Sequence, residues 1–429
     1  MKRQVIQVVV FLLALICCNL ASAQSIMVGP DGKFKKGVVS VPYAFYNRNF
    51  GAAGGYAYAV TGSPQKQAAL IATAMVGSKG SVLGFLMGRD LKIPYTHRLF
   101  LDAVVNAGYF QDVDIYTTGN SDFPDERAGS NDSDEDNYVN SDGGWDNFFR
   151  LRFKYLLPIG HGKETIITQK VDRGLLVDGA TGGESWNPLV SGRTYFELKP
   201  FYRLQQVDGD DVQEDVKTNG LELSLFRDNR DFKLNPSTGS ALRLKFNRDF
   251  GWFDSSNSWT VLDAEFDKYF SLGESDWFRQ RVLAFDFWTA YSPTWNEKSN
   301  GDIENGAPSF AGATLGGLWR LRGFPSQRFS DKAAIYYAAE MRFIPRWNPF
   351  DGWPWLQKYL GVQWLQFVPF VEVGRVAPDW NIEDLHEDMK WSAGLGIRLW
   401  AKGLVARIDS AASDEGFEVQ MMVAQPFQF

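Results

Sequence analysis

Hydrophobic and polar residues alternate along much of the chain. In the final segment, Phe417, Val419, Met421 and Val423 are separated by Glu418, Gln420 and Met422. The same two-residue period recurs at 149–155, 242–247 and 335–343. Such a period is typical of β-strands whose two faces meet different environments. The pattern predicts a sheet protein and, by itself, fits both a soluble β-sandwich and a membrane barrel.

The alternating segments and the turn residues between them predict sixteen strands. We place them at 37–48, 53–61, 67–77, 80–89, 97–109, 148–157, 194–205, 219–228, 240–250, 259–270, 279–290, 334–344, 364–374, 391–400, 403–411 and 415–428. A weaker candidate at 164–170 is left out, because single-chain bacterial barrels have an even number of strands and both ends on the periplasmic side.

The N-terminus has the features of a secretory signal. Lys2 and Arg3 precede a mostly apolar run over 5–16, and the small residues of 21–23 follow it. This predicts a cleaved signal peptide over 1–23. The run is shorter than the roughly 20 apolar residues that a membrane-spanning helix needs. No other stretch is long enough, so any crossing of a membrane must be made by strands.

Composition favours the barrel over the sandwich. The chain has 15 Trp, 16 Tyr, 33 Phe and 41 Gly, yet only 45% of its residues are hydrophobic. Barrels combine a lipid-facing side, a polar lumen and aromatic residues at both interfaces. We therefore predict an all-β fold, a transmembrane antiparallel barrel of about 16 strands over 37–429, preceded by a short segment at 24–36. Its expected location is the bacterial outer membrane, and its surroundings are lipid and lipopolysaccharide.

An even strand count assigns each connection to one side of the membrane. The connections at 110–147, 206–218 and 291–333 then lie outside the cell, where long polar loops belong. The first two are acidic, and we expect them to be solvated or bridged by divalent cations rather than to form a specific calcium site. Their acidic residues are Asp132, Asp134, Glu135, Asp136, Asp208, Asp210, Asp211, Glu214 and Asp215. The segment 158–193 is long for a periplasmic turn, and the sequence gives no account of it.

Other chemistry is not readable in the chain. Its three histidines, His97, His161 and His386, are far apart in sequence, and both cysteines belong to the predicted signal. No metal-ligand spacing, phosphate-binding loop or nucleophile elbow occurs. With a formal charge of −7, nucleic-acid binding has no support. We expect neither an enzyme nor a cofactor-binding protein.

Four motifs stand in a fixed order. The segment 227–239 carries turn chemistry, 321–324 reads Leu-Arg-Gly-Phe inside a long loop, and 370–374 reads Phe-Val-Glu-Val-Gly on a strand, followed by Ser-Ala-Gly-Leu-Gly-Ile-Arg at 392–398. The turn residues of interest are Arg227, Asp228, Arg230, Asp231, Pro236 and Gly239. Asp228, Arg230 and Asp231 are expected to satisfy each other and the backbone.

This order and spacing resemble the barrel of the bacterial surface antigen family, the superfamily of outer-membrane protein assembly factors and two-partner-secretion transporters. The resemblance covers essentially all of the chain after the signal. It implies that the long extracellular loop folds into the lumen and that Arg322 meets an acidic residue of the wall, which by position is Glu372. The family usually has aspartate there.

The other motif residues take supporting roles. Gly323 would permit a turn or a close approach of the backbone, and Phe324 would pack against the wall, where Phe370 and Gly374 flank Glu372. A bidentate, charge-assisted pair of Arg322 with one carboxylate could hold the loop in a polar lumen. The terminal Phe427 and Phe429 resemble the recognition signal by which assembly machinery inserts outer-membrane barrels. Family members that handle polypeptides usually carry periplasmic POTRA modules, for which this chain leaves no room, so we expect a short, barrel-only branch.

The strands that close the barrel each contain a proline, Pro42 and Pro426. Each proline removes a backbone donor, which suggests a weak seam that opens sideways toward lipid. The prolines could equally sit at strand ends or point away from the ladder.

Three functions remain open from the sequence. The first is outer-membrane biogenesis, in which an unfolded protein or a lipid is translocated or inserted. The second is a passive diffusion channel, and the third is a structural or adhesive surface barrel.

Overall fold

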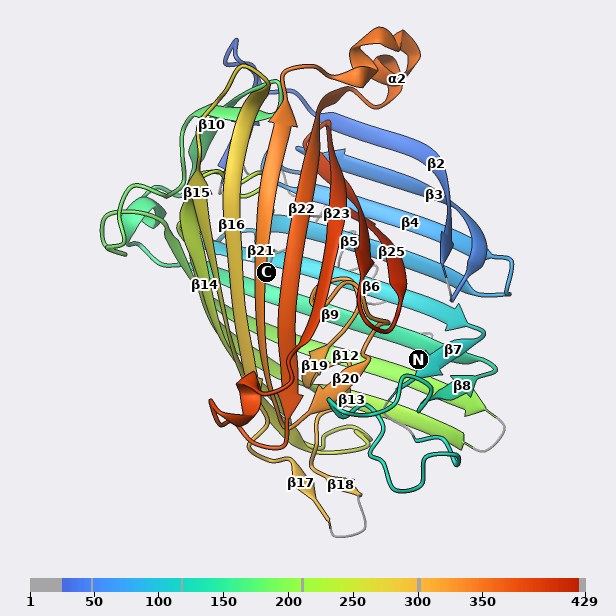
Figure 1. The fold of residues 1–429 in the computed structure, drawn as a ribbon. Helices are drawn as coiled ribbons and strands as arrows, with labels where there is room; N and C mark the ends of the chain where they lie inside the picture. Colours follow the sequence, from blue (N-terminus) through green and yellow to red (C-terminus); the bar gives the residue numbers. More distant parts are fainter. Residues whose placement is uncertain (1–24, 48, 117–118, 210–211, 299–301, 424–429) are drawn as a thin grey trace.

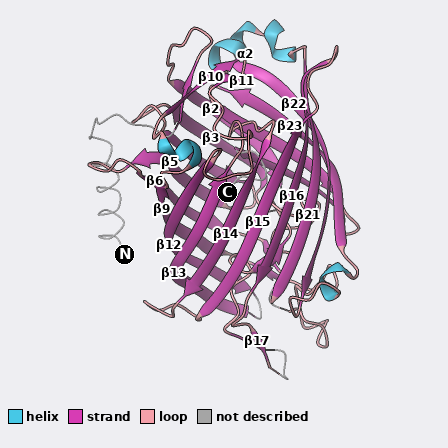
Figure 2. Ribbon diagram, turned by 90° about the vertical axis from the view of Figure 1, so that its left-hand side faces the viewer, coloured by secondary structure: helices cyan, strands magenta, loops and turns pink. Residues whose placement is uncertain are grey.

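The wall is one antiparallel sheet of sixteen strands that curls around a central space (Figures 1 and 2). The computed structural model describes residues 25–47, 49–116, 119–209, 212–298 and 302–423. Each predicted strand corresponds to one strand of this sheet. In spatial order these are β2 (Gly37–Asn47), β3 (Gly51–Thr61), β4 (Ala69–Gly77), β5 (Val82–Lys92), β6 (Leu99–Phe110), β9 (Gly144–Leu156), β12 (Arg193–Gly209), β13 (Val212–Asp228), β14 (Gly239–Asp249), β15 (Trp259–Ser271), β16 (Phe278–Tyr291), β21 (Ala333–Pro345), β22 (Val362–Ala377), β23 (Lys390–Ala401), β24 (Leu404–Ala412) and β25 (Phe417–Val423).

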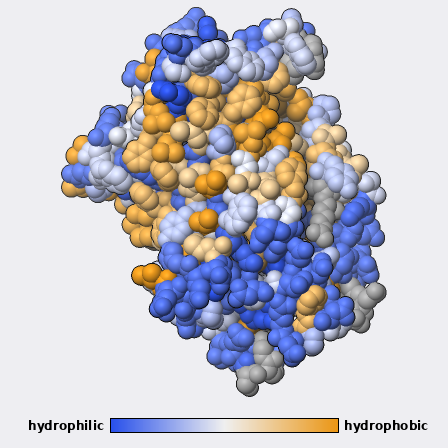
Figure 3. Space-filling model, in the orientation of Figure 1, coloured by the Kyte–Doolittle hydropathy of each residue, from blue (hydrophilic) through white to orange (hydrophobic). Residues whose placement is uncertain are grey.

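The two faces of the wall differ as the alternation predicts. On β14, Leu244 and Phe246 are exposed on the outer face, whereas Arg243, which precedes Leu244, is buried on the inner face. Outward apolar residues of many strands join into a hydrophobic band, and a hydrophilic region lies below it in Figure 3. An apolar band around a polar interior is the arrangement of a transmembrane barrel. None of the helices in the described part of the chain is long and apolar enough to span a membrane.

The connections carry small elements of their own. The end where β2 begins is the periplasmic end, by the rule that both chain ends lie there. It bears η1 (Gly160–Lys163), η2 (Pro349–Gly352) and α2 (Pro354–Tyr359). The opposite, extracellular end bears β7 (Val113–Ile115), β8 (Val139–Ser141), β17 (Asn296–Glu297), β18 (Ile303–Glu304), β19 (Ala313–Leu315), β20 (Phe329–Asp331) and η3 (Asp384–His386).

The prediction that residues 206–218 form an acidic loop is wrong. β12 and β13 pair without interruption up to Gly209 and Val212, so that Gln206 stands opposite Asp215. Both strands therefore extend beyond the apolar band into water. There the polar sequence still supports backbone pairing, although it no longer shows the alternation by which the strand was recognised.

The segments 24–36 and 158–193, which the sequence left unexplained, meet in a second sheet. β1 (Ser25–Val28) pairs in parallel with β10 (Ile167–Asp172), and β10 pairs antiparallel with β11 (Leu175–Asp178). β10 covers most of the weak strand candidate at 164–170, so leaving that candidate out of the wall kept the strand count even. Met27, Val171, Leu175 and Leu176 of the sheet pack against the buried wall residues Trp364 and Trp400. The small sheet thus lies against the inner wall at the periplasmic end.

The turn between β23 and β24 contacts the first two strands of the wall and so links its two edges. β2 and β25 do not pair within the described ranges, but Lys402, between β23 and β24, donates to Val38 O at 2.8 Å and accepts from Thr61 Oγ1 at 2.9 Å. Pro42 lies inside β2, opposite Tyr56, and not at a strand end. Pro426, Phe427 and Phe429 lie outside the described residues, as does the predicted signal peptide 1–23.

Candidate functional site

The second half of the loop between β16 and β21, residues 307–332, enters the lumen and is packed there, whereas the β17–β18 hairpin of the same loop projects at the extracellular end (Figure 1). Its β19–β20 hairpin pairs Ala313 with Asp331 and lies within the barrel outline in Figure 1. Apolar loop residues form one buried cluster with inward residues of the wall, of which the largest are Trp259 and Trp288. The loop members include Leu315, Leu321, Phe324 and Phe329. The loop is therefore a plug, held first by hydrophobic contact.

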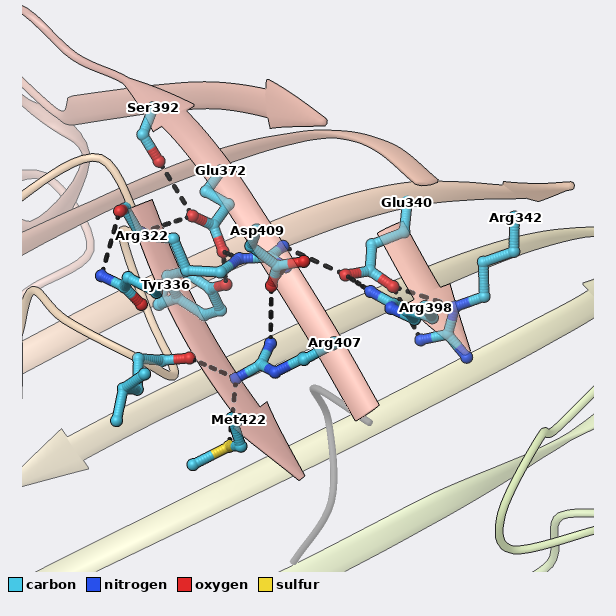
Figure 4. A network of polar contacts seen from close by, with 12 residues as sticks. Arg322, Tyr336, Glu340, Arg342, Glu372, Ser392, Arg398, Arg407, Asp409 and Met422 are labelled. Carbon is cyan, nitrogen blue, oxygen red and sulfur yellow. Dashed lines mark hydrogen bonds and ion pairs between the residues drawn. The ribbon is translucent and has the colours of Figure 1, made fainter. Parts of the chain in front are cut away.

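Arg322 is the charged centre of the plug. Its side chain is fully buried, and Nε donates to Glu372 Oε1 at 2.9 Å, Nη1 to Asp409 Oδ2 at 2.8 Å and Nη2 to Glu340 Oε1 at 3.1 Å (Figure 4). Its backbone N–H donates to Glu372 Oε2 at 2.6 Å. The ring of Phe370 lies 3.6 Å from the guanidinium carbon. One side chain thus joins the plug to β21, β22 and β24.

The three carboxylates are shared with further partners on the wall. Glu372 accepts from Tyr336 Oη at 2.6 Å and from Ser392 Oγ at 2.8 Å. The remaining contacts of the network are ion pairs: Glu340 with Arg342 and Arg398, at 2.7 and 2.8 Å, and Asp409 with Arg407, at 2.8 Å. Arg322 is therefore the only cation paired with Glu372 among the residues described, while the other two carboxylates keep wall partners.

The backbone around Arg322 is shaped for close contact. Leu321 has a left-handed conformation, with φ of 53°. A β-carbon on Gly323 would lie 2.8 Å from Ser392 Cβ and 2.9 Å from the backbone of Ala412, so no side chain fits there. Gly323 O accepts from Ser413 Oγ at 2.9 Å, and Arg322 O accepts from Gln420 Nε2 at 3.2 Å. The motif is thereby tied to the last two strands of the wall.

The structure brings Arg322, Glu372 and Phe370 together. It also shows that three carboxylates share the positive charge of Arg322, which the sequence did not indicate. The expected bidentate pair with one carboxylate is wrong, because the guanidinium is spread over three. The sequence did not single out Glu340, Asp409 or Arg407, and it indicated Arg398 only as the last residue of the motif at 392–398. Their signal was present as charged residues at inward positions of alternating strands, but alternation alone does not tell which inward charges meet.

A second buried arginine, Arg328, joins the plug to the extracellular surface. It donates to Glu415 Oε2 at 2.7 Å, to Ser133 Oγ at 2.8 Å and to Ser133 O at 2.6 Å. Burial raises the pKa of Glu415, although Arg328 opposes this shift. Ser133 belongs to the β6–β9 connection, 111–143, so this connection is fastened over the plug. Sequence reasoning missed Arg328.

The acidic residues of the β6–β9 connection point away from these contacts. Asp132, Asp134, Glu135 and Asp136 are exposed. No group of three or more His, Cys, Asp or Glu in the described ranges is arranged to hold a metal ion.

The β13–β14 turn, 229–238, closes the periplasmic end. Asp228 and Arg230 form a fork with two contacts of 2.7 Å. Asp231 instead accepts from the backbone N–H groups of Phe232 and Ser237, at 2.8 and 2.9 Å. The turn tightens around Pro236 and ends at Gly239, where φ is +98° and a β-carbon would collide with Asn229 O.

The same turn reaches across the lumen. Phe232 is buried and its ring lies 5.7 Å from that of Trp400 on β23. Asn235 contacts Gln280 on β16 and Gln366 on β22. Arg227 takes no part in the turn. It is paired instead with the β9–β12 connection, where it donates to Trp186 O at 3.0 Å.

A known protein family and several solved structures are similar to this chain. Residues 189–408 match the Omp85 superfamily domain. No curated protein matches the sequence. Among solved structures, CdiB from Escherichia coli is similar with a TM-score of 0.54 and 12% identity, over 91% of this chain and 62% of CdiB. BamA from Haemophilus ducreyi lacking POTRA domains 1-3 is similar with a TM-score of 0.46 and 12% identity, over 91% of this chain and 69% of that protein.

The family match begins in the β9–β12 connection and ends on β24, one residue before Asp409. It includes the β13–β14 turn, the plug motif around Arg322 and two of the wall carboxylates that hold it, Glu340 and Glu372. The chain is an outer-membrane barrel that belongs to the Omp85 superfamily.

Proposed function

We propose that this barrel translocates or inserts protein or lipid at the outer membrane, as a transporter or insertase rather than an enzyme. The observation that carries the proposal is the buried network around Arg322, which holds a folded plug in the lumen through contacts to three carboxylates. A folded plug that is held by one hydrophobic cluster and one ionic centre can be released as a unit, which suits a transporter that is closed until cargo engages it. The cargo would be an unfolded polypeptide or a lipid.

A passive channel is the weaker alternative. Open diffusion needs a continuous water-filled path. Here the plug fills the middle, the β13–β14 turn and the small sheet lie at the periplasmic end, and the β6–β9 connection covers the plug from outside. Three layers would have to move before solutes could pass.

The plug contacts also favour opening next to the last strands. Ser413, Gln420 and Arg407 all bind backbone oxygens of the plug, at 2.9, 3.2 and 2.6 Å. They belong to β24, β25 and the turn between them, beside the edge where β25 and β2 meet no partner in the described ranges. Release of the plug would therefore loosen the last strands of the wall, beside this edge.

Planar-bilayer recording tests the closed state. We expect the protein to be mostly closed and Arg322→Ala to increase open events strongly, because Glu372 loses its cation and the plug loses its centre. Arg346→Ala is the control, since the Arg346–Glu274 pair lies exposed at the periplasmic rim. Steady conductance of the unaltered protein would favour the passive channel instead.

Two experiments in cells test transport. Depletion should reduce other outer-membrane proteins or disturb lipid asymmetry, as read by proteomics and lipid analysis of the same cells. If neither changes, a structural or adhesive role is the better explanation. Cysteines at Val38 and Lys402, joined by a bis-maleimide, should abolish function if the seam opens at its periplasmic end, and full activity of the linked barrel would exclude such opening.

A further inference from the structure

Part of the β9–β12 connection folds over the outside of the barrel. Asn229 of the β13–β14 turn holds it: its side chain donates to Ser185 O at 3.1 Å and accepts from Ser191 Oγ at 2.7 Å and Gly183 N at 3.3 Å. The segment 184–190 is thereby fixed beside the outer faces of β13 and β15. In Figure 1 the connection projects from the wall beside β14 and β15, and in Figure 3 this side of the wall adjoins the hydrophobic band.

This segment exposes large apolar side chains. Trp186, Leu189 and Val190 are 63%, 60% and 56% exposed. Trp186 stacks on Phe266, an outward residue of β15, with ring centroids 6.1 Å apart. Exposed apolar residues that continue the lipid-facing band are expected to enter the bilayer, and tryptophan prefers its interface. The segment therefore meets the periplasmic leaflet.

Two cations lie at the same place. Lys268 Nζ is 4.5 Å from the centroid of the Trp186 ring, and Arg227 donates to Trp186 O at 3.0 Å. Both come from outward positions at the periplasmic ends of their strands, and neither forms an ion pair with a carboxylate in the described ranges. The nearby Arg346, by contrast, is paired with Glu274 at 2.8 Å. The positive charge of Lys268 and Arg227 is thus left without an anion from the protein.

We propose that Trp186, Lys268 and Arg227 form a binding site for the phosphate of an anionic phospholipid in the periplasmic leaflet. The tryptophan anchors the segment at the interface, and the two cations supply the charge that a phosphodiester needs. Lipopolysaccharide is not the expected ligand, because it occupies the opposite leaflet. Zwitterionic phospholipids should bind more weakly, since their ammonium group cancels the phosphate charge.

Native mass spectrometry of the purified barrel tests the site. Phosphatidylglycerol and phosphatidylcholine with the same acyl chains are titrated into the detergent-solubilised protein, and retained lipids are counted. We expect preferential retention of phosphatidylglycerol and a loss of affinity of about fivefold for each charge removed by Arg227→Gln or Lys268→Gln. Trp186→Ala should also weaken retention. Arg346→Gln is the matched control at the same rim and should leave retention unchanged.

The outcomes separate the proposal from its rivals. A migration shift on heating in gel electrophoresis verifies that each variant is folded. Equal retention of the two lipids, or undiminished retention in the folded Arg227→Gln/Lys268→Gln double variant, would overturn the proposal. Displacement of phosphatidylglycerol by millimolar inorganic phosphate would also overturn it, because the site would then bind the free ion rather than the lipid.

Discussion

At the scale of single residues, the protein depends on charges that are removed from water. An isolated buried ion costs several kcal/mol, so each must be matched by partners. Arg322 meets this requirement with contacts to Glu340, Glu372 and Asp409. The three carboxylates differ in what remains when the Arg322 side chain is lost. Glu340 and Asp409 keep other arginines. Glu372 keeps two hydroxyl donors and the backbone N–H of residue 322 but has no cation left among the residues described.

This inequality gives a stability prediction. Arg322→Ala should lower the free energy of unfolding by about 3–5 kcal/mol, because Glu372 is left as an uncompensated buried charge. Urea titration in detergent, followed by the heat-dependent gel shift, measures it. The Arg322→Ala/Glu372→Gln double variant should recover part of the loss, and Arg346→Ala should cost less than about 1 kcal/mol because its pair is exposed. A double variant no more stable than Arg322→Ala would refute the charge explanation.

Arg328 gives a second prediction at this scale. Arg328→Ala removes charge-assisted contacts to Ser133 and Glu415, each worth about 1.5–3 kcal/mol. The β6–β9 connection should then open at least tenfold more often, and trypsin should cleave it after Arg127 correspondingly faster. Lys298→Ala, which removes an exposed pair with Glu304, is the control. An unchanged cleavage rate in Arg328→Ala would show that this residue does not fasten the connection.

At the scale of elements, the local sequence is enough to predict the strands of the wall but not the structure of the connections between them. Each hairpin pairs neighbours in sequence, so alternation and turn chemistry suffice to place it. The sheet of β1, β10 and β11 is different, because Ser25 pairs in parallel with Ile167. Neither strand alternates clearly, and their apolar residues are explained only by Trp364 and Trp400, which lie against them.

The β9–β12 connection should depend on one side chain of the neighbouring turn. Asn229→Ala removes the partner of the buried Ser191 hydroxyl, at about 1–3 kcal/mol, and also leaves the N–H of Gly183 and the carbonyl of Ser185 without their side-chain partner. Amide hydrogen exchange over 181–191 should become about tenfold faster or more. Asn187→Ala is the control, because its side chain makes only an exposed contact to the N–H of Leu189 and should alter exchange at that amide alone. Unaltered exchange in Asn229→Ala would mean that the backbone contacts alone hold the connection.

At the scale of the whole molecule, the barrel is an apolar band around a filled interior. Exposed outward residues such as Leu244 contrast with buried inward charges such as Arg243 on the same strand. The interior is filled by the plug from one end and by the turn and small sheet from the other. The same contacts therefore stabilise the barrel and keep its lumen closed.

The hydrophobic band predicts that a charge on the outward face destabilises the barrel by an amount that depends on its depth in the membrane. Leu244→Arg places a charge in the middle of the outward face of β14 and should destabilise the barrel in lipid vesicles by about 2–4 kcal/mol. Lys245→Arg keeps the charge at the adjacent inward position, where Lys245 pairs with Asp263 at 2.8 Å, and should be nearly neutral. Equal stability of Leu244→Arg and the unaltered protein in vesicles would show that this face does not meet hydrocarbon.

The sequence by itself determined the wall of the barrel and the identity of its central arginine. Alternation follows from a sheet that faces lipid on one side, so the strands could be placed without knowledge of the fold. The extension of β12 and β13 into water escaped prediction, because the alternation ends where the lipid does.

Only the tertiary structure decided which inward charges meet and how the ends are covered. Glu340, Asp409 and Arg398 converge on the plug because the sheet curls, and β1 reaches β10 because the chain returns to the same end of the barrel. Local sequence carries no record of such encounters, since the free energy that fixes them comes from groups far apart in the chain that the curled wall brings together.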